Sequence, residues 1–385
     1  MNHRISNLPY SIFHKQKLTW FLNGERLKIS NSSISIAEFE IDNLSIFPLA
    51  FIARMRGLWY TMCRMKLMNF SRLKPLFFQL VICSLFITGL IGCATLQATP
   101  SFEIGQIYRV SNQTLLTVDD LTPHLLTADV IFLGEEHYTP SHLEAAITVL
   151  DLLRKHERQP GLAMEMLSWD GQPGLDRYMN NPEMTVPQFL EESRWKENWG
   201  GEFPDYQPLV DYARTYQLPL LGLNPPRSLV RLVATKGLTE ALKAPELASW
   251  AMTKEATDDP EYESLIFEQI TACHPKLPDH VYRRIFEASI IRDEGMATVI
   301  RTFLEKRPTH QTPLVSYTGG GHIQYGVPIP KRVKRMQPKV KTVTMYLVAW
   351  DPSKEEEVRA ELQNGIADYL WLTPLGPNGL QERCG

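Results

Sequence analysis

Short apolar runs alternate with longer amphipathic segments, and this alternation limits the possible folds more than any other feature of the chain. The runs cover residues 129–133, 161–166, 218–223, 313–317 and 343–348. Apolar runs of this length that end at Gly, Pro or polar residues are typical of buried strands. Helical patterns between such strands indicate crossover connections. We therefore predict an α/β fold with a parallel sheet flanked by helices.

The connection between the third and fourth runs is too long for a simple loop, since it spans roughly ninety residues where a handful would suffice. Its apolar spacing is helical, most clearly from Tyr282 to Phe303. We predict a helical subdomain inserted between the third and fourth strands, at about residues 225–306 of a domain that covers 129–385.

The N-terminal part of the chain differs from the rest in charge. Residues 1–92 hold 11 of the 40 Lys and Arg residues but only 4 of the 43 Asp and Glu residues. The remainder is therefore acidic, which argues against nucleic-acid binding because that function needs a basic surface. The excess of positive charge in 1–92 requires a separate explanation.

A lipoprotein signal peptide supplies that explanation. Basic residues precede the apolar run 75–90, which ends in Leu90-Ile91-Gly92-Cys93. We predict a signal peptide at 65–92, with Cys93 acylated and anchored in the membrane. A single transmembrane anchor is the alternative, although the run is short for a span. Ala94 after the cysteine favours the outer membrane of a bacterial envelope, facing the periplasm.

The segments on either side of the signal peptide are less informative. Residues 1–64 lack clear periodicity and are interpreted as an upstream mis-assigned start, with a genuine N-terminal extension as the alternative. Residues 93–128 are expected to form a lipidated linker and lead-in. Cys273 and Cys384 could form one disulfide in an oxidising compartment or remain free, and their spacing matches no metal-binding pattern.

Polar side chains follow the first four predicted strands where each strand ends. Because parallel strands end at the same rim of a sheet, and ligands bind there, these residues are expected to line one pocket. Three further polar residues on the predicted long helix could face the same rim. Two alternatives to a binding site remain. The residues could belong to ordinary charged loops, or they could be buried polar side chains whose hydrogen bonds only stabilise the core. The predicted rim residues are Glu135, Glu136, His137, Glu165, Asn224, Arg292, Asp293, Glu294, Gly319 and His322.

These residue types allow two kinds of hydrolytic chemistry. A metal ion held by His137, His322 and Glu165 could activate water. Alternatively, His137 could act as a base that Glu135 orients. A serine-hydrolase elbow of the form G-x-S-x-G is absent.

An aromatic, glycine-containing segment, 195–201, lies between the second and third strands. Such a segment beside a strand-end crevice suits a flat apolar ligand. A Tyr nearby could supply a phenolate to ferric iron.

Taken together, these motifs resemble those of the ChaN-like haem-binding lipoproteins, which are related to the Tiki metalloproteases and the erythromycin esterases. The resemblance runs in order through about 128–372. It is carried by Val130–His137, Ala163–Met166, Asp205–Val210, Leu223–Arg227, Glu287–Ala288, Arg292–Ala297, Gly319–His322 and Ala367–Trp371.

The resemblance implies functions that the residues alone do not. It implies haem binding in iron uptake, with a Tyr on the iron and a homodimer that encloses haem, and an outer-membrane haem receptor is a further expected partner. We expect Tyr206 to be the ligand because it lies in a matching motif, with Tyr138 beside the rim as the second candidate. On this resemblance, binding is favoured over catalysis, and the metal-dependent hydrolase remains the alternative.

Overall fold

The computed structural model describes residues 102–248, 254–307, 312–377 and 379–380, and two short pairs near the start of the chain. The chain divides into two units, Met1–Leu96 and Gln97–Gly385. In the first, β1 (Phe21–Leu22) pairs antiparallel with β2 (Glu25–Arg26). The predicted signal peptide and Cys93 lie outside the described residues and stay predictions. No helix in the described part is both long and apolar enough to cross a membrane.

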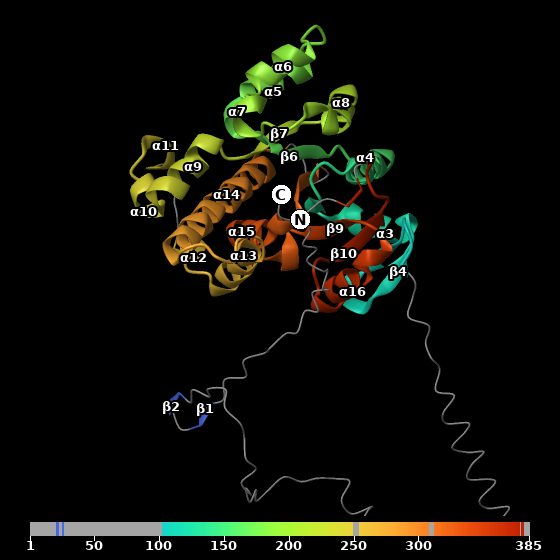
Figure 1. The fold of residues 1–385 in the computed structure, drawn as a ribbon. Helices are drawn as coiled ribbons and strands as arrows, with labels where there is room; N and C mark the ends of the chain where they lie inside the picture. Colours follow the sequence, from blue (N-terminus) through green and yellow to red (C-terminus); the bar gives the residue numbers. More distant parts are fainter. Residues whose placement is uncertain are drawn as a thin grey trace, which may run out of the picture. The chain divides into compact units, whose positions relative to one another are not determined.

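An eight-stranded sheet forms the centre of the second unit, in the order β4-β3-β10-β9-β5-β8-β6-β7 (Figure 1). The six strands from β10 to β7 are parallel, and β3 is antiparallel to both β10 and β4. The strands are β3 (Ile107–Arg109), β4 (Thr114–Leu116), β5 (Val130–Glu135), β6 (Gly161–Ser168), β7 (Leu220–Asn224), β8 (Leu314–Gly319), β9 (Thr342–Ala349) and β10 (Tyr369–Thr373).

The predicted α/β class with a parallel sheet is confirmed, and all five predicted strands are present. The sequence pattern missed three strands at one edge, β3, β4 and β10. Two of them are only three residues long, and β4 is mostly exposed. Such short segments give no periodic signal, and pairing at the edge of the sheet creates them.

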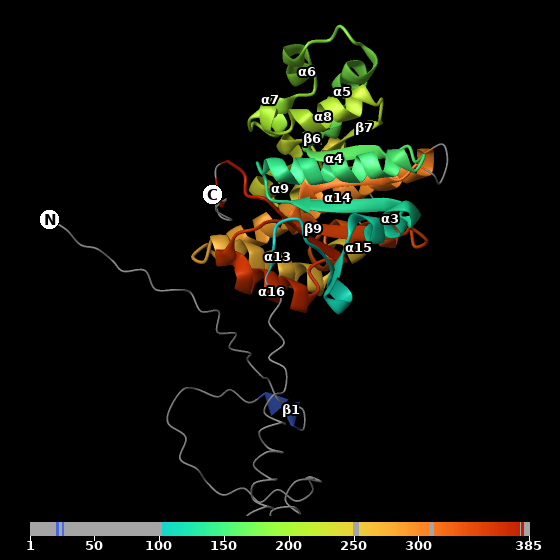
Figure 2. The same cartoon turned by 90° about the vertical axis from the view of Figure 1, so that its right-hand side faces the viewer.

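Helices cover both faces of the sheet (Figures 1 and 2). The α-helices are α3 (Val118–Thr127), α4 (Pro140–Lys155), α5 (Gln172–Asn180), α6 (Val186–Glu192), α7 (Trp195–Asn198), α8 (Gln207–Thr215), α9 (Arg227–Lys236), α10 (Leu238–Ala241), α11 (Pro245–Ala248), α12 (Lys254–Thr257), α13 (Pro260–Cys273), α14 (Asp279–Lys306), α15 (Ile329–Met336) and α16 (Glu355–Asn364). The described residues also form six short 3-10 helices: η1 (Val110–Asn112), η2 (Trp169–Gly171), η3 (Phe203–Asp205), η4 (Gly320–His322), η5 (Gln324–Gly326) and η6 (Pro352–Lys354).

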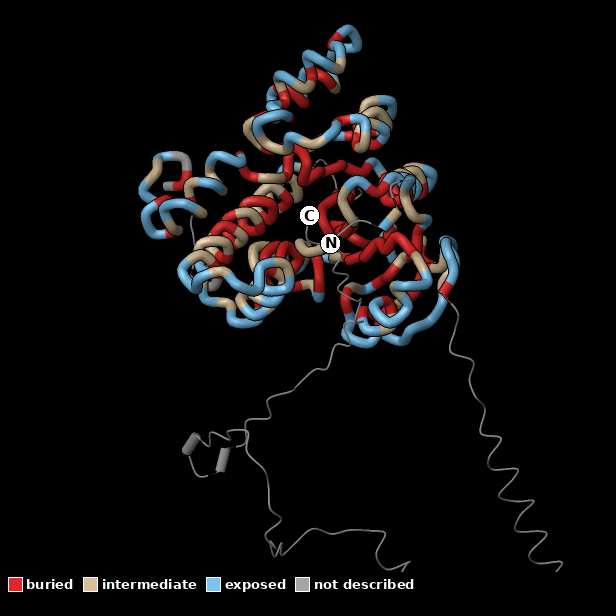
Figure 3. Tube along the Cα trace, viewed as in Figure 1, coloured by how far each residue is buried: buried red, intermediate tan, exposed pale blue. Residues whose placement is uncertain are grey.

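Alternating residues of β5 supply two hydrophobic cores. Ile131 and Leu133 join the core that includes residues of α3, α4 and α8, whereas Val130 and Phe132 join the core that includes residues of α14, α15 and α16. This division follows from the period of two in a strand. All six residues of β5 are buried, and Figure 3 shows buried positions gathered in the strands and on the inner sides of helices. β5 is therefore held rigidly, and so is the polar segment that follows it.

In its described parts, the long connection between β7 and β8 consists of the helices α9 to α14 joined by short turns and loops, with no strand. The 28-residue helix α14 contributes to more than one core. Met296 and Ile300 belong to the main core, whereas Tyr282 and Phe286 pack in a smaller cluster with α13. The connection is therefore continuous with the sheet through α14, which carries its polar residues to the rim. Cys273, at the end of α13, is disulfide-bonded.

Candidate functional site

The carboxyl ends of β5 and β8 form the centre of the site because these two strands are neighbours in register. Glu135, the last residue of β5, lies opposite Gly319, the last residue of β8. Glu165 comes from the adjacent strand β6, at a register irregularity between Met164 and Ser168. The Gly319 N–H donates to Glu165 Oε2 at 2.7 Å. Of the four strand ends predicted to meet, those of β5, β6 and β8 therefore lie together in the fold.

Glu165 is a buried carboxylate surrounded by cations. It forms an ion pair with Arg292 of α14, and its Oε1 lies 3.3 Å from His322 Nε2. Burial by itself would raise the pKa of Glu165, but His322 and Arg292 hold it well below the ordinary value. A buried charge needs such partners. Glu165 is thus a buried anion that holds Arg292, His322 and the Gly319 N–H together.

The imidazole ring of His322 lies between two carboxylates. Its Nδ1 lies 2.5 Å from Asp293 Oδ1, and its other ring nitrogen faces Glu165. Burial opposes protonation, yet Glu165 and Asp293 raise the pKa of His322 to about 9. Tyr262 of α13 donates to the other Asp293 oxygen at 2.5 Å. His322 is therefore an imidazolium at neutral pH, with both nitrogens engaged.

His137 and Glu135 form a second histidine–carboxylate pair. His137 Nδ1 hydrogen-bonds Glu135 Oε1, and Tyr317 donates to Glu135 Oε2 at 3.4 Å. Burial raises the pKa of Glu135, while Glu135 raises the pKa of His137 against the effect of burial. The Glu135 side chain is 0% exposed and that of His137 is 39% exposed. The ring of His137 is therefore partly open to solvent, whereas the Glu135 carboxylate that orients it is buried.

Aromatic rings continue the site beyond His137. The Trp199 ring lies 5.0 Å from the His137 ring, nearly perpendicular to it. Tyr138 is 36% exposed and has a left-handed backbone, with φ of 61°. A Cβ added to Gly201 would lie 2.5 Å from the Tyr138 hydroxyl, so this glycine lets the phenol approach the loop. A non-glycine residue held at positive φ is uncommon and marks a constrained position.

Tyr206 occupies a different environment from Tyr138. It is fully buried, and its hydroxyl accepts a hydrogen bond from the Tyr138 backbone N–H at 3.3 Å. Burial raises the pKa of Tyr206 far above its ordinary value. The aromatic cluster around it includes Trp195 and Trp199. Tyr206 therefore supports the residue that follows His137 and presents no surface to a ligand.

Three of the predicted rim residues point elsewhere or stand apart. Glu136 pairs with Lys354 at 2.9 Å, on the side of η6. Glu294 pairs with Arg332 and Arg335 of α15. Asn224 ends β7, and its buried Oδ1 has no hydrogen-bond partner among the described residues. The sequence pattern did not single out Tyr262 or Tyr317, although Tyr317 shares the strand face of Gly319 at a spacing of two.

The geometry of these side chains favours ion pairing over metal ligation. Within the described residues, no group of three or more His, Cys, Asp and Glu side chains is arranged to hold a metal ion. Of the alternative set, both nitrogens of His322 face carboxylates, one nitrogen of His137 binds Glu135, and Glu165 pairs with Arg292. The site therefore consists of two histidine–carboxylate pairs and an exposed aromatic wall.

The fold and this rim define a class, the α/β proteins with a parallel sheet, which bind ligands at the carboxyl ends of their strands. Comparison with known proteins identifies a family within this class. The chain belongs to the family described as haem-binding uptake, Tiki superfamily, ChaN, whose pattern matches residues 121–333. The predicted family is thus confirmed.

Known structures and sequences resemble this chain to different degrees. A structure titled "Cofacial heme binding to ChaN of Campylobacter jejuni" superposes with a TM-score of 0.54 and 19% identity, over 69% of this chain and 95% of that one. An erythromycin esterase variant superposes with a TM-score of only 0.36 and 14% identity, over 63% of this chain and 76% of that one. The chloroplastic protein RETICULATA-RELATED 5 of Arabidopsis thaliana is 27% identical over 270 residues, covering 66% of this chain and 35% of the relative. This chain therefore spans well under half of that relative.

Proposed function

We propose that this protein binds haem at the strand-end rim, with the Tyr138 phenol oxygen as the iron ligand, and serves in haem or iron uptake. The observation that carries the proposal is the position of Tyr138. Its ring is partly exposed beside His137, on a constrained left-handed backbone that follows the rigid strand β5. A ligand atom must be reachable and firmly placed, and Tyr138 meets both conditions.

Tyr138 replaces Tyr206 as the proposed ligand. A phenolate on Tyr206 would have to form in a fully buried site where burial and Glu135 raise its pKa. Burial, Asp205 and Glu135 also raise the pKa of Tyr138, but this residue is 36% exposed. A partly exposed phenol keeps more of its hydration on losing its proton than a fully buried one. Tyr138 is therefore the phenol that ferric iron can reach and that loses its proton more easily.

The neighbouring side chains suit a flat macrocycle. Rings of His137, Tyr138 and Trp199 lie within 6.4 Å of one another, centroid to centroid, and offer an apolar and aromatic wall. Ligand sites combine such walls with a few placed polar groups. When bound, the haem would supply its own redox and ligand-binding chemistry at iron. The chain would orient the macrocycle and hold the proton of Tyr138 or release it.

Two features of the proposal concern assembly and location. A haem on this partly open wall would keep one face exposed, so we infer that a second copy of the chain covers it, giving a homodimer. We also infer that the mature protein is held in the bacterial envelope by a lipid on Cys93, within reach of an outer-membrane haem receptor. The motif around Cys93 supports the anchor.

Titration of the mature domain with haemin tests the proposal. We expect a saturable Soret shift with a defined stoichiometry, and light scattering before and after titration should detect a dimer. A protein that gives no saturable shift would rule out haem binding. A haem-loaded monomer would remove the dimer while leaving the binding site.

Acid–base hydrolysis is the second candidate, and a specific observation favours it. Glu135 orients the partly exposed His137 through Nδ1, which leaves Nε2 for a reacting proton. This is the arrangement of a general base with its orienting carboxylate. Ester and peptide turnover by the purified protein, compared with His137→Ala and Glu135→Gln, tests it. Equal turnover in all three proteins would exclude this role.

A further inference from the structure

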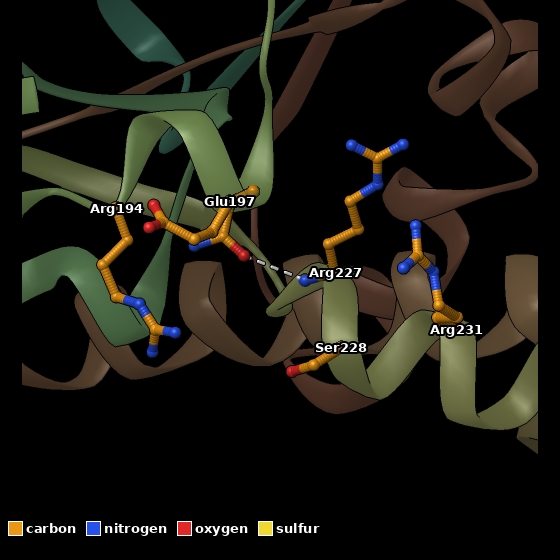
Figure 4. Close-up of a pocket in the computed structure, with 6 residues that line it drawn as sticks. Arg194, Glu197, Arg227, Ser228 and Arg231 are labelled. Atoms are coloured by element: carbon orange, nitrogen blue, oxygen red, sulfur yellow. Dashed lines mark hydrogen bonds between the residues drawn. The ribbon is translucent and has the colours of Figure 1, made fainter. Parts of the chain in front are cut away.

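A cavity of about 250 Å³ lies beside the aromatic segment and is rich in arginine. Residues of α7 and the start of α9 form its walls. Figure 4 shows the side chains of Arg227 and Arg231 extending in the same direction, whereas Glu197 points away from Arg227. The lining residues are Arg194, Glu197, Asn198, Arg227, Ser228 and Arg231.

The three arginines of the cavity differ in whether their side chains are paired. Arg194 forms an ion pair with Asp170 at 2.6 Å. The guanidinium groups of Arg227 and Arg231 have no hydrogen-bond or ion-pair partner within the described part of the chain. They lie four residues apart on α9, where like charges repel each other. The positive N-terminal end of α9 adds to the same field. This end of the cavity thus carries uncompensated positive charge.

The beginning of α9 is fixed in place. The Arg227 backbone N–H donates to Asn198 Oδ1 at 2.9 Å, and Asn198 Nδ2 donates to Asp170 at 3.0 Å. These bonds tie α9 to α7, the helix that leads into Trp199. The arginine pair and the aromatic wall are therefore held by one set of contacts, and the charge is in place before any ligand arrives.

Only two glycines separate the arginine pair from the proposed iron ligand. A Cβ added to Gly200 would lie 3.9 Å from Arg227 Nη1, and one added to Gly201 would lie 2.5 Å from the Tyr138 hydroxyl. Consecutive Cα atoms are about 3.8 Å apart. The cationic cavity and the Tyr138 oxygen thus lie on adjacent parts of one loop.

We propose that Arg227 and Arg231 bind the propionate carboxylates of haem and so fix its orientation on Tyr138. This inference rests on the proposed haem function. The two propionates share one edge of the macrocycle, and two guanidinium groups on successive turns of one helix match two carboxylates on one edge. Arginine suits carboxylates because its planar donors can bind both oxygens. The pair selects a macrocycle with free carboxylates.

The test compares haemin with haemin dimethyl ester, in which both carboxylates are blocked, by Soret titration. The proteins are the wild type, the single variants Arg227→Gln and Arg231→Gln, their double variant, and Lys236→Gln, which removes one positive charge from α9 outside the cavity and so matches each single variant. We expect the wild type and Lys236→Gln to prefer haemin over the ester by roughly two- to fivefold per arginine, the range for exposed charge pairs, since Arg227 and Arg231 are both exposed. The double variant should bind both ligands with the wild type's affinity for the ester.

The outcomes separate this inference from the function on which it rests. If the wild type binds haemin saturably but does not discriminate against the ester, the arginine pair has no role in recognition. If the double variant keeps the full preference for haemin, other residues bind the propionates. Absence of any haemin binding by the wild type overturns the haem function and this inference together.

Discussion

The imidazole of His137 lies directly against Gly319, so that a Cβ at position 319 would be 3.0 Å from His137 Cε1 and 3.2 Å from Nε2. β5 and β8 pair in parallel, which sets their last residues side by side. The glycine therefore makes room for the ring of His137 between the two strand ends. The Gly319 N–H donates to Glu165 Oε2, so the same glycine contacts both halves of the site.

Gly319→Ala should displace the His137 ring and destabilise the protein by about 1–3 kcal/mol, the usual cost of overpacking. Gly321→Ala is the control in the same loop, since its Cβ would meet the Gln269 side chain at an ordinary 3.6 Å. We expect the control to stay within about 1 kcal/mol of wild type. Urea unfolding of both variants measures the difference. Equal losses would show that the ring is not held against Gly319.

Tyr138→Phe should abolish the ferric phenolate charge-transfer absorption of the haem-loaded protein, because it removes the proposed ligand oxygen. Tyr206→Phe removes only a buried acceptor for the Tyr138 N–H and should cost about 1 kcal/mol of stability while keeping the absorption. Visible spectra of the two haemin-loaded variants decide the assignment. Loss of the absorption in Tyr206→Phe alone would return the ligand to Tyr206.

Glu165→Gln should destabilise the fold by roughly 3 kcal/mol, the low end for breaking a buried pair, because Arg292 retains some solvent contact. The change leaves Arg292 and the His322 imidazolium without their shared anion. Glu240→Gln is the control, since it makes the same change at an exposed pair with Lys243 and should cost about 1 kcal/mol or less. Denaturant titration of both variants measures the gap, and similar costs would contradict the organising role of Glu165.

Stability should decline at alkaline pH because of His322. Its pKa is raised to about 9 in the folded state, against about 6.5 when unfolded. The stabilisation from its proton is therefore fully present below about pH 6.5 and is lost as the pH rises through about 9. Glu165 and Asp293, whose pKa values are lowered, act oppositely and lose their contribution on acidification.

Free energies of unfolding at intervals between pH 6 and pH 10 check this prediction. His322→Gln should flatten the alkaline part of the profile, because no imidazolium remains to lose its proton. His124→Gln, at an exposed site on α3, is the control and should keep the wild-type slope. An unchanged profile in His322→Gln would show that other groups cause the alkaline loss.

The sequence by itself determined the fold class and the edge of the sheet at which the polar residues lie. Apolar runs of strand length are local, so the strands β5 to β9 were predictable, and so were the polar side chains at the carboxyl ends of β5, β6 and the β8–η4 segment. The residues that resemble the ChaN-like family also lie in continuous short motifs, from Val130–His137 to Gly319–His322. The edge strands β3 and β4 were not predictable, because three-residue segments become strands only through their neighbours.

Tertiary structure alone decided which side chains form the site. Glu135 and Glu136 are adjacent in sequence, yet one is buried against His137 and the other pairs with Lys354. Tyr206 lies in a family motif but is buried, whereas Tyr138 is exposed. Burial and ion pairing depend on segments far apart in the chain, as when α14 brings Arg292 to Glu165. The local sequence determines where strands form and which residue types follow them. Packing between distant segments determines where each side chain points and whether it is charged.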